Sequence, residues 1–400
     1  MPDLHHHNRI HRARQLRMYR RRYKYPDRHM YTLPSRFPPS AFNKAASCFI
    51  LSVARPETEY KLTERLIAML LASIIIHAAQ PIRHERSSAS IYHLLQGKRS
   101  AQTLQDAHMY GLTHLFGIYP KLSRQFFDQV AEDAMQEESQ DILKNLPYFN
   151  GMTYQTQTEP FLYRLLLLVQ LLSNLAKEEK QYIPVTDNPA IQHWIKQLYR
   201  QEQHHLEDWR NGVYKELYGL LGKLPQIQAD LFVDRMTGYH HIGLTTVQLA
   251  EKYHVHETDV LLYQTSTVHH LLQHAESDGA AYPYLAALMD RPQQQIRSIT
   301  TTAQKTRTML ERGMSVEQIA LVRGLSENTI KDHIVEITWI DGEALSSKFI
   351  SDNDASIILA SAMQAGTNKL KQIHALLEGK YDYFQIRLAL ALRKEQEVKA

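Results

Sequence analysis

The chain has 400 residues, of which 44% are hydrophobic and 22% are charged, a balance that excludes a disordered or fibrous protein and allows two or three domains. Its single cysteine, Cys48, excludes an internal disulfide and hence the class of disulfide-stapled secreted proteins. The formal net charge is only +4, but residues 1–56 hold twelve lysines and arginines against two aspartates, so the remaining residues are net acidic.

Residues 1–56 are a basic segment that holds six of the 15 prolines and lacks apolar periodicity, and we expect it to be disordered. Three interpretations of this segment are open. Residues 20–25, with the sequence RRRYKY, fit a nucleic-acid-binding arm. The arginine excess also fits a targeting presequence, and Met30 allows the segment to be a translated stretch upstream of the true start.

Beyond the basic segment, apolar residues recur at helical spacing and strand-like alternation is rare, which predicts an all-α protein. The first domain, residues 57–145, is expected to hold a buried helix that includes residues 66–79 and further helices at 90–95, 100–115 and 122–135. The apolar run is too short to cross a bilayer and no secretory signal is visible, so we expect a cytoplasmic protein that does not bind a membrane.

A turn-rich joint at residues 145–158 leads into the middle helical region, residues 146–300. Helices are expected at 161–179, at 189–221 and at 227–236, and the second of them is expected to break near Asn211 and Gly212. The last domain, residues 301–396, holds the most informative pattern of the chain.

This pattern runs from residue 315 to residue 339. Ser315 and Gln318 fit the reciprocal N-cap of a first helix. Gly324 permits a sharp turn that a side chain would obstruct, and Ser326 fits the N-cap of a second helix. A small residue followed by a glycine four positions on and an isoleucine ten positions on is the spacing of a DNA-binding helix-turn-helix.

The second helix of such a unit presents its N-terminal residues to the major groove. Hydroxyl groups suit phosphate oxygens, an asparagine can read an adenine edge and a cation can neutralise a phosphate, whereas His333 fits packing on the helix flank equally well. Residues 304–340 hold five basic and five acidic side chains, so clustered positive charge is missing and an ordinary helical corner stays open. The candidate DNA contacts are Ser326, Asn328, Thr329, Lys331 and Arg323.

The same spacing recurs upstream, where Ala250 and Val260 take the places of the small residue and the isoleucine. His254 stands where the turn glycine is expected, and Thr246 fits the N-cap. We predict a degenerate second helix-turn-helix over residues 245–272, with a plain helical pair as the alternative.

Residues 314–334, with the sequence MSVEQIALVRGLSENTIKDHI, resemble the helicase-type helix-turn-helix domain found at the C-terminus of many RecQ-family DNA helicases. The likeness continues to residues 383–388, with the sequence YFQIRL. Residues 90–107 and 115–120 resemble the N-terminal region of the YpbB family, whose members are stand-alone companions encoded beside a RecQ-like helicase in Gram-positive bacteria. The resemblance implies a non-catalytic DNA-binding accessory protein that acts with a RecQ-like helicase in DNA repair or recombination.

Two other functions are open. Residues 324–333 also resemble the recognition domain of LuxR-type regulators, which would make the chain a helix-turn-helix transcription regulator. The neutral charge around the second helix is also compatible with a purely protein-binding helical scaffold.

The sequence contains no catalytic, cofactor or metal motif. Residues 97–100 mimic the end of a phosphate loop, but Tyr92 stands where its first glycine belongs, and the absence of a complete loop excludes a helicase motor. The histidines of residues 240–274 lack cysteine partners and the H-E-x-x-H spacing, and Cys48 has no evident general base. We therefore expect no enzyme activity, no cofactor and no bound metal.

Overall fold

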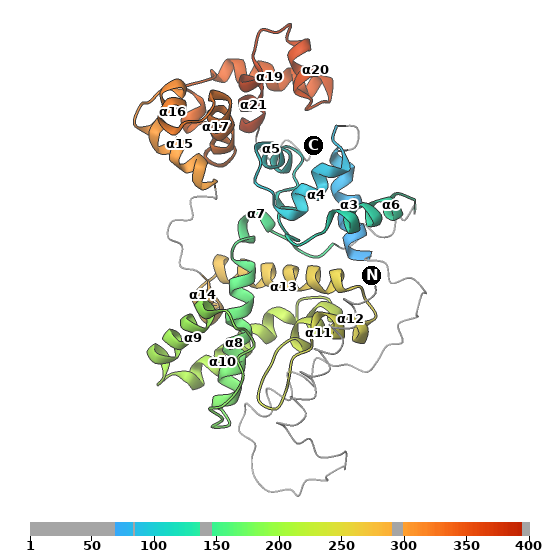
Figure 1. The fold of residues 1–400 in the computed structure, drawn as a ribbon, viewed down its shortest axis with the longest axis vertical. Helices are drawn as coiled ribbons and strands as arrows, with labels where there is room; N and C mark the ends of the chain where they lie inside the picture. Colours follow the sequence, from blue (N-terminus) through green and yellow to red (C-terminus); the bar gives the residue numbers. More distant parts are fainter. Residues whose placement is uncertain (1–68, 83–84, 137–145, 290–298, 394–400) are drawn as a thin grey trace, which may run out of the picture. The chain divides into compact units, whose positions relative to one another are not determined.

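The computed structural model describes residues 69–82, 85–136, 146–289 and 299–393 (Figure 1). The predicted disordered segment 1–56 and Cys48 lie outside these residues. Within them the chain forms no strand beyond an isolated bridge between Gly238 and His241, so the prediction of an all-α fold is confirmed. None of the described helices combines the length and the hydropathy needed to cross a bilayer.

Residues 69–136 form the first group of helices. The apolar run predicted as a buried helix is the first of them, and its Leu71 and Ile74 are fully buried. The part of that predicted helix before residue 69 lies outside the described residues. The group comprises α3 (Met69–Ile82), α4 (Ser88–Gln96), α5 (Ala101–Met109), the short 3-10 helix η1 (Thr113–Leu115) and α6 (Arg124–Gln136).

The prediction of one helix over residues 100–115 is wrong, because the chain forms two elements there. Helix α5 begins where the Thr103 N–H donates to the Ser100 hydroxyl (3.2 Å). It ends at Met109, since Gly111 adopts a left-handed backbone with φ of +66° that an α-helix does not accommodate. The chain then continues into η1.

Residues 146–289 form the second group, in which α8, α10 and α13 share one apolar core. A short helix, α7, lies within the predicted turn-rich joint, so that the joint is partly helical. The group comprises α7 (Gly151–Tyr154), α8 (Thr158–Leu175), α9 (Pro189–Glu202), α10 (Leu206–Leu221), α11 (Gln226–Asp234), α12 (Thr246–Tyr253), α13 (Glu257–Ser277) and α14 (Pro283–Leu288).

The break predicted near Asn211 and Gly212 is misplaced. The chain breaks between Glu202 and Leu206, and Gly212 lies inside α10. A Cβ atom on Gly212 would lie 1.9 Å from Cε2 of Tyr284 on α14. Glycine therefore serves here to let two helices approach closely and not to end a helix.

Residues 299–393 form the third group, which shares a hydrophobic cluster with the first group. Helix α5 packs against α17 and α21 (Figure 1), and the imidazole of His108 stacks on Trp339 with ring centroids 5.0 Å apart. The third group comprises α15 (Thr301–Glu311), α16 (Val316–Arg323), α17 (Glu327–Asp341), α18 (Glu343–Ser346), α19 (Asp352–Ala365), α20 (Leu370–Leu376) and α21 (Tyr383–Leu392).

A buried histidine on α13 connects this helix to the segment around α7. His269 is only 1% exposed, and its Nδ1 accepts a hydrogen bond from the Asn150 N–H (3.0 Å). The proton therefore resides on Nε2, which faces the Thr158 hydroxyl at 3.0 Å, while that hydroxyl donates to the Tyr154 carbonyl. Burial lowers the pKa of His269 to about 3, so the ring is neutral in the folded protein.

The two glycines of α10 make a matched test of this packing. We expect Gly212→Ala to lower the free energy of unfolding by about 1–3 kcal/mol, because the new methyl group overlaps the Tyr284 ring. Gly219→Ala should instead raise it by about 0.5–1 kcal/mol, since no atom lies within 4 Å of the new Cβ and alanine favours the helix. Urea unfolding of both variants measures the difference; equal effects would contradict the packing described.

The neutral state of His269 predicts acid sensitivity. In the unfolded chain the ring takes up a proton near its ordinary pKa of 6.5, whereas the folded protein binds none until about pH 3. Stability is therefore fully present above pH 6.5 and falls as the pH decreases, by about 1.4 kcal/mol from this group between about pH 7.5 and 5.5. His269→Asn keeps an acceptor but does not titrate, so urea unfolding at the two pH values should show a smaller loss. An unchanged pH dependence would refute the assignment.

Candidate nucleic-acid interface

Helices α16 and α17 begin with the caps predicted from the sequence. The Ser315 hydroxyl accepts a hydrogen bond from the Gln318 N–H (3.3 Å), and the Gln318 side chain accepts one from the Ser315 N–H (2.9 Å). At the second helix the Ser326 hydroxyl accepts a hydrogen bond from the Thr329 N–H (3.1 Å). Both caps satisfy backbone donors that the helices leave unpaired, so the starts of both helices are determined by sequence.

The turn between them depends on the backbone of Gly324. This residue adopts φ of +62°, and the following Leu325 N–H donates to the Ala320 carbonyl (3.0 Å), which closes the end of α16. No atom lies within 4 Å of the position where a Cβ would stand. The expectation that the turn disfavours a side chain therefore holds, and the reason is the left-handed backbone itself and not a clash with a neighbouring residue.

The apolar residues of the motif close the corner between the two helices. Ala320 is 8% exposed at the crossing of α16 and α17, and Ile319 is fully buried below it. The predicted stripe of α17 is also fully buried, at Ile330, Ile334 and Ile337. The small residue and the aliphatic stripe thus have the packing roles that the spacing assigns to them.

Four of the five predicted DNA contacts lie at the first turn of α17 or just beyond it. Ser326 and Asn328 are exposed, and Thr329 is half-exposed, with its hydroxyl 2.9 Å from that of Ser326. In the described part of the chain the Asn328 amide forms no hydrogen bond, so it is available to a ligand. The ammonium group of Lys331 lies over the Phe384 ring, 5.6 Å from its centroid.

Arg323, the fifth predicted contact, points back to α15. Its guanidinium donates to the carbonyl and the hydroxyl of Thr302 (2.9 and 2.7 Å) and to the hydroxyl of Thr306. The same hydroxyl of Thr306 lies 2.9 Å from Nδ1 of His333, which is buried. Burial, together with the nearby charge of Arg323, lowers the pKa of His333. Arg323 therefore connects the end of α16 to α15 through hydrogen bonds.

Beyond its first turn, α17 is covered by protein. Helices α15, α16, α21 and α5 all pack against it. Glu336 is buried and accepts a hydrogen bond from the Thr300 hydroxyl (3.0 Å), and burial raises the pKa of its carboxyl. In the described structure, the N-terminal turn is therefore the main part of α17 that could enter a groove of DNA.

Residues 304–340 hold equal numbers of basic and acidic side chains, but two of the acidic ones interact with arginines from other parts of the chain. Asp332 is paired with Arg387 on α21, and Glu336 interacts electrostatically with Arg99, which precedes α5. Both arginines lie outside the counted segment. The surface near the first turn of α17 is therefore less acidic than the count indicates, although Glu327 remains exposed there.

Helices α12 and α13 repeat the geometry of α16 and α17. His254 takes the left-handed conformation of Gly324, with φ of +53°, and the Val255 N–H donates to the Ala250 carbonyl (3.1 Å). The N-cap is Thr245 and not Thr246 as predicted, and it forms the same reciprocal cap with Gln248. The same reciprocal cap and the same backbone hydrogen bond across the turn occur in both helix pairs. The two helix pairs therefore share one local geometry.

The first turn of this second unit is covered. Asp259 is buried, and its carboxylate accepts a hydrogen bond from the Leu71 N–H at the start of α3 (3.4 Å). The ring of His256 stacks on Phe126 of α6 with centroids 5.2 Å apart. The second unit therefore docks onto the first group of helices, and its first turn is not available to DNA.

The structure also shows what becomes of the phosphate-loop mimic and of the histidines that could suggest a metal site. The phosphate-loop mimic is a pair of helix caps, with Gly97 ending α4 in a left-handed conformation and Ser100 beginning α5. Among the residues that the structure describes, no group of three or more histidine, cysteine, aspartate or glutamate side chains is arranged to hold a metal ion.

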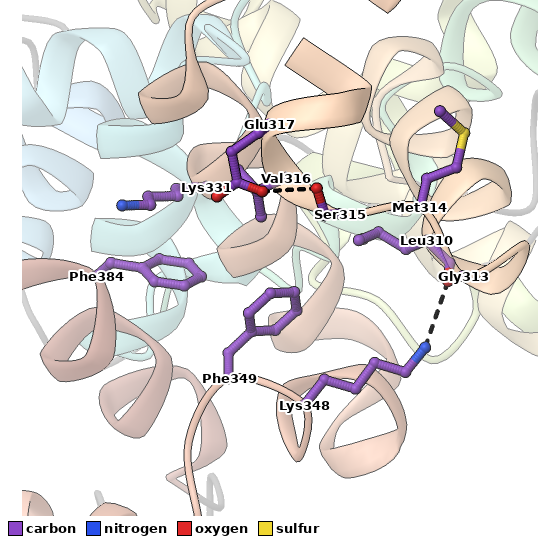
Figure 2. Close-up of a pocket in the computed structure, with 10 residues that line it drawn as sticks. All are labelled: Leu310, Gly313, Met314, Ser315, Val316, Glu317, Lys331, Lys348, Phe349 and Phe384. Carbon is purple, nitrogen blue, oxygen red and sulfur yellow. Dashed lines mark hydrogen bonds between the residues drawn. The ribbon is translucent and has the colours of Figure 1, made fainter. Parts of the chain in front are cut away.

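Sequence reasoning missed a cavity of about 370 Å³ beside Lys331 (Figure 2). Lys348, Phe349 and Phe384 line it, and they come from segments far from the helix-turn-helix spacing. No local pattern indicates that these residues line one cavity, because the packing of α18 and α21 against α17 brings them together.

Comparisons with known proteins agree with the geometry. Residues 302–390 match a family described as a helix-turn-helix domain. The chain is 31% identical over 340 residues to Protein YpbB of Bacillus subtilis (strain 168), a similarity that covers 79% of this chain and 95% of that protein. No solved structure matches the chain significantly. The resemblance noted from the sequence is thus confirmed, and the chain belongs to the YpbB family.

Proposed function

We propose that this chain is a non-catalytic, cytoplasmic DNA-binding protein that acts with a RecQ-like DNA helicase in DNA repair or recombination. The observation that carries the DNA-binding part is the open first turn of α17, with its exposed Asn328 and Ser326. The helicase part rests on the resemblance of residues 314–334 to the domain at the C-terminus of RecQ-family helicases.

The chemistry of the first turn suits a moderate grip on DNA. The unpaired N–H groups and the dipole at the start of α17 favour a phosphate, the Asn328 amide can pair with an adenine edge, and Lys331 adds a cation. The exposed carboxylate of Glu327 opposes phosphate binding at the same turn. A weak grip of this kind gains from a partner that holds the same DNA, which is the role that the helicase would have.

A protein-binding role is the second candidate, and a specific surface favours it. Leu321 and Val322, at the end of α16, are 85% and 63% exposed although both are aliphatic. Neighbouring aliphatic side chains left in water at the edge of a folded domain are typical of a contact with another protein. This surface and the first turn of α17 can serve together, one for the helicase and the other for DNA.

DNA binding should be sensitive to salt and to the first turn of α17. We expect Lys331→Ala to weaken binding to all sequences and to reduce the slope of log K against log salt by about 1. Asn328→Ala should weaken binding without changing the slope, because an amide releases no counterion. Lys215→Ala, on an exposed part of α10, is the matched control. Fluorescence anisotropy with labelled DNA measures these effects, and no binding at low salt would disprove the proposal.

The helicase partnership makes a separate prediction. Replacing Leu321 and Val322 together by serine should abolish binding to the purified RecQ-like helicase of the same organism, since it removes the exposed apolar contact. Leu376→Ser, at a position that is 57% exposed on α20, is the control and should bind normally. Surface plasmon resonance measures the affinity. Unimpaired binding of the double variant would place the helicase elsewhere, and no binding by the unaltered protein would remove the helicase from the proposed function.

A further inference from the structure

The cavity beside the first turn of α17 has a size and a wall that suit a small planar ligand (Figure 2). Its volume of about 370 Å³ is in the range of small-molecule sites. The wall combines the end of α15, the start of α16 and α17 with the segment that follows α18 and with α21. All of these elements belong to the residues that match the helix-turn-helix family.

Two aromatic rings form the apolar part of the wall. Phe349 and Phe384 pack edge to face, with centroids 5.6 Å apart and planes at 73°, and both are half-buried. In an edge-to-face pair one ring presents its edge and the other its face, so part of each aromatic surface stays accessible from the cavity. These rings supply a platform on which a flat, unsaturated group can stack.

Two ammonium groups lie on either side of this platform in Figure 2. Lys331 lies over the Phe384 ring, and Lys348 donates a long hydrogen bond to the Leu310 carbonyl (3.4 Å). In the described residues neither ammonium forms an ion pair. The single carboxylate among the lining residues is that of Glu317, which accepts a hydrogen bond from the Ser315 hydroxyl (2.6 Å) and interacts electrostatically with Lys331. Two ammonium groups against one carboxylate leave the lining with a surplus of one positive charge.

We propose that this cavity holds an unpaired base of single-stranded DNA, with the base stacked on the face of one of the two rings, Phe349 or Phe384, and in contact with the edge of the other, and with the flanking phosphates at Lys331 and Lys348. Aromatic platforms with neighbouring cations are the usual means by which proteins hold single strands without reading their sequence. A base inside a duplex is stacked on its neighbours and cannot enter the cavity without being unpaired.

The position of the cavity refines the proposed function, on which this inference rests. Lys331 follows Asn328 by three residues on α17, so it belongs both to the cavity and to the end of the helix that faces DNA. A strand that leaves a duplex held at the first turn of α17 meets the cavity next. The preferred ligand is therefore a junction of duplex and single strand, the form of DNA that a helicase produces.

Binding of three labelled DNAs tests the proposal: an oligo(dT) of about 16 nucleotides, a hairpin duplex and a fork that combines them. Phe384→Leu keeps the apolar volume but removes the aromatic face. We expect it to weaken binding to oligo(dT) and to the fork by about ten-fold and to leave the duplex affinity unchanged. Tyr383→Leu is the matched control, because Tyr383 is an exposed aromatic on the same helix that stacks on His374 and does not line the cavity.

A second pair of measurements keeps the test independent of any loss of folding. Lys348→Gln should reduce the salt slope for oligo(dT) by about 1 and leave that for the duplex unchanged. The fluorescence of 2-aminopurine placed in the single strand should be quenched by the unaltered protein and by the Tyr383→Leu variant, but not by Phe349→Leu.

The outcomes separate this inference from the proposed function. Duplex binding with an oligo(dT) affinity that Phe384→Leu and Phe349→Leu leave unchanged overturns the inference alone. Equal losses for duplex and single strand overturn it as well, because the rings would then act only through the fold. An oligo(rU) that binds ten-fold tighter than oligo(dT) overturns the assignment to DNA. Failure to bind any of the DNAs overturns both the inference and the proposed function.

Discussion

The packing of the third group of helices depends on the burial of α17. The aliphatic stripe of this helix, and most of its other faces beyond the first turn, are covered by neighbouring helices. Ile330, Ile334 and Ile337 have no exposed surface, and α15, α16, α21 and α5 supply the covering surfaces. Because apolar side chains gain free energy only when neighbours exclude water from them, each of these helices is held in place by the same central element. The first turn escapes this burial, and that exception is the part available for function.

Burial of α17 also determines which polar groups are structural. Once the helix is enclosed, its buried Glu336 and His333 need partners. Thr300, just before α15, supplies the first partner and Thr306 of α15 supplies the second. The stacking of His108 on Trp339 extends this enclosure to the first group of helices, and burial lowers the pKa of that imidazole to about 4. A polar residue close to a recognition helix can thus hold neighbouring helices together instead of contacting a ligand.

The features that follow local rules were predictable from the sequence. The caps at Ser315 and Ser326 and the turn at Gly324 depend on neighbours in the chain, and the structure has them where the spacing places them. The prediction of a helix break near Gly212 failed for a different reason. Glycine is needed there because the Tyr284 ring of another helix packs against it, which the local sequence does not indicate. The same holds for the inward turn of Arg323 and for the cavity at Phe384, because both depend on helix packing that no local pattern specifies.

In the proposed function, the docking of the helix pair α12 and α13 onto the first group limits how the protein would read DNA. Regulators that recognise palindromes place two recognition helices about 34 Å apart, one helical turn of DNA, and each subunit usually contributes one. Here the first turn of α13 is occupied by α3 and α6, so the described part of one chain presents a single recognition helix. If the proposed function holds, a monomer therefore contacts one half-site at most. Its selectivity for DNA would then come from the shape of a junction and not from the number of bases that it reads.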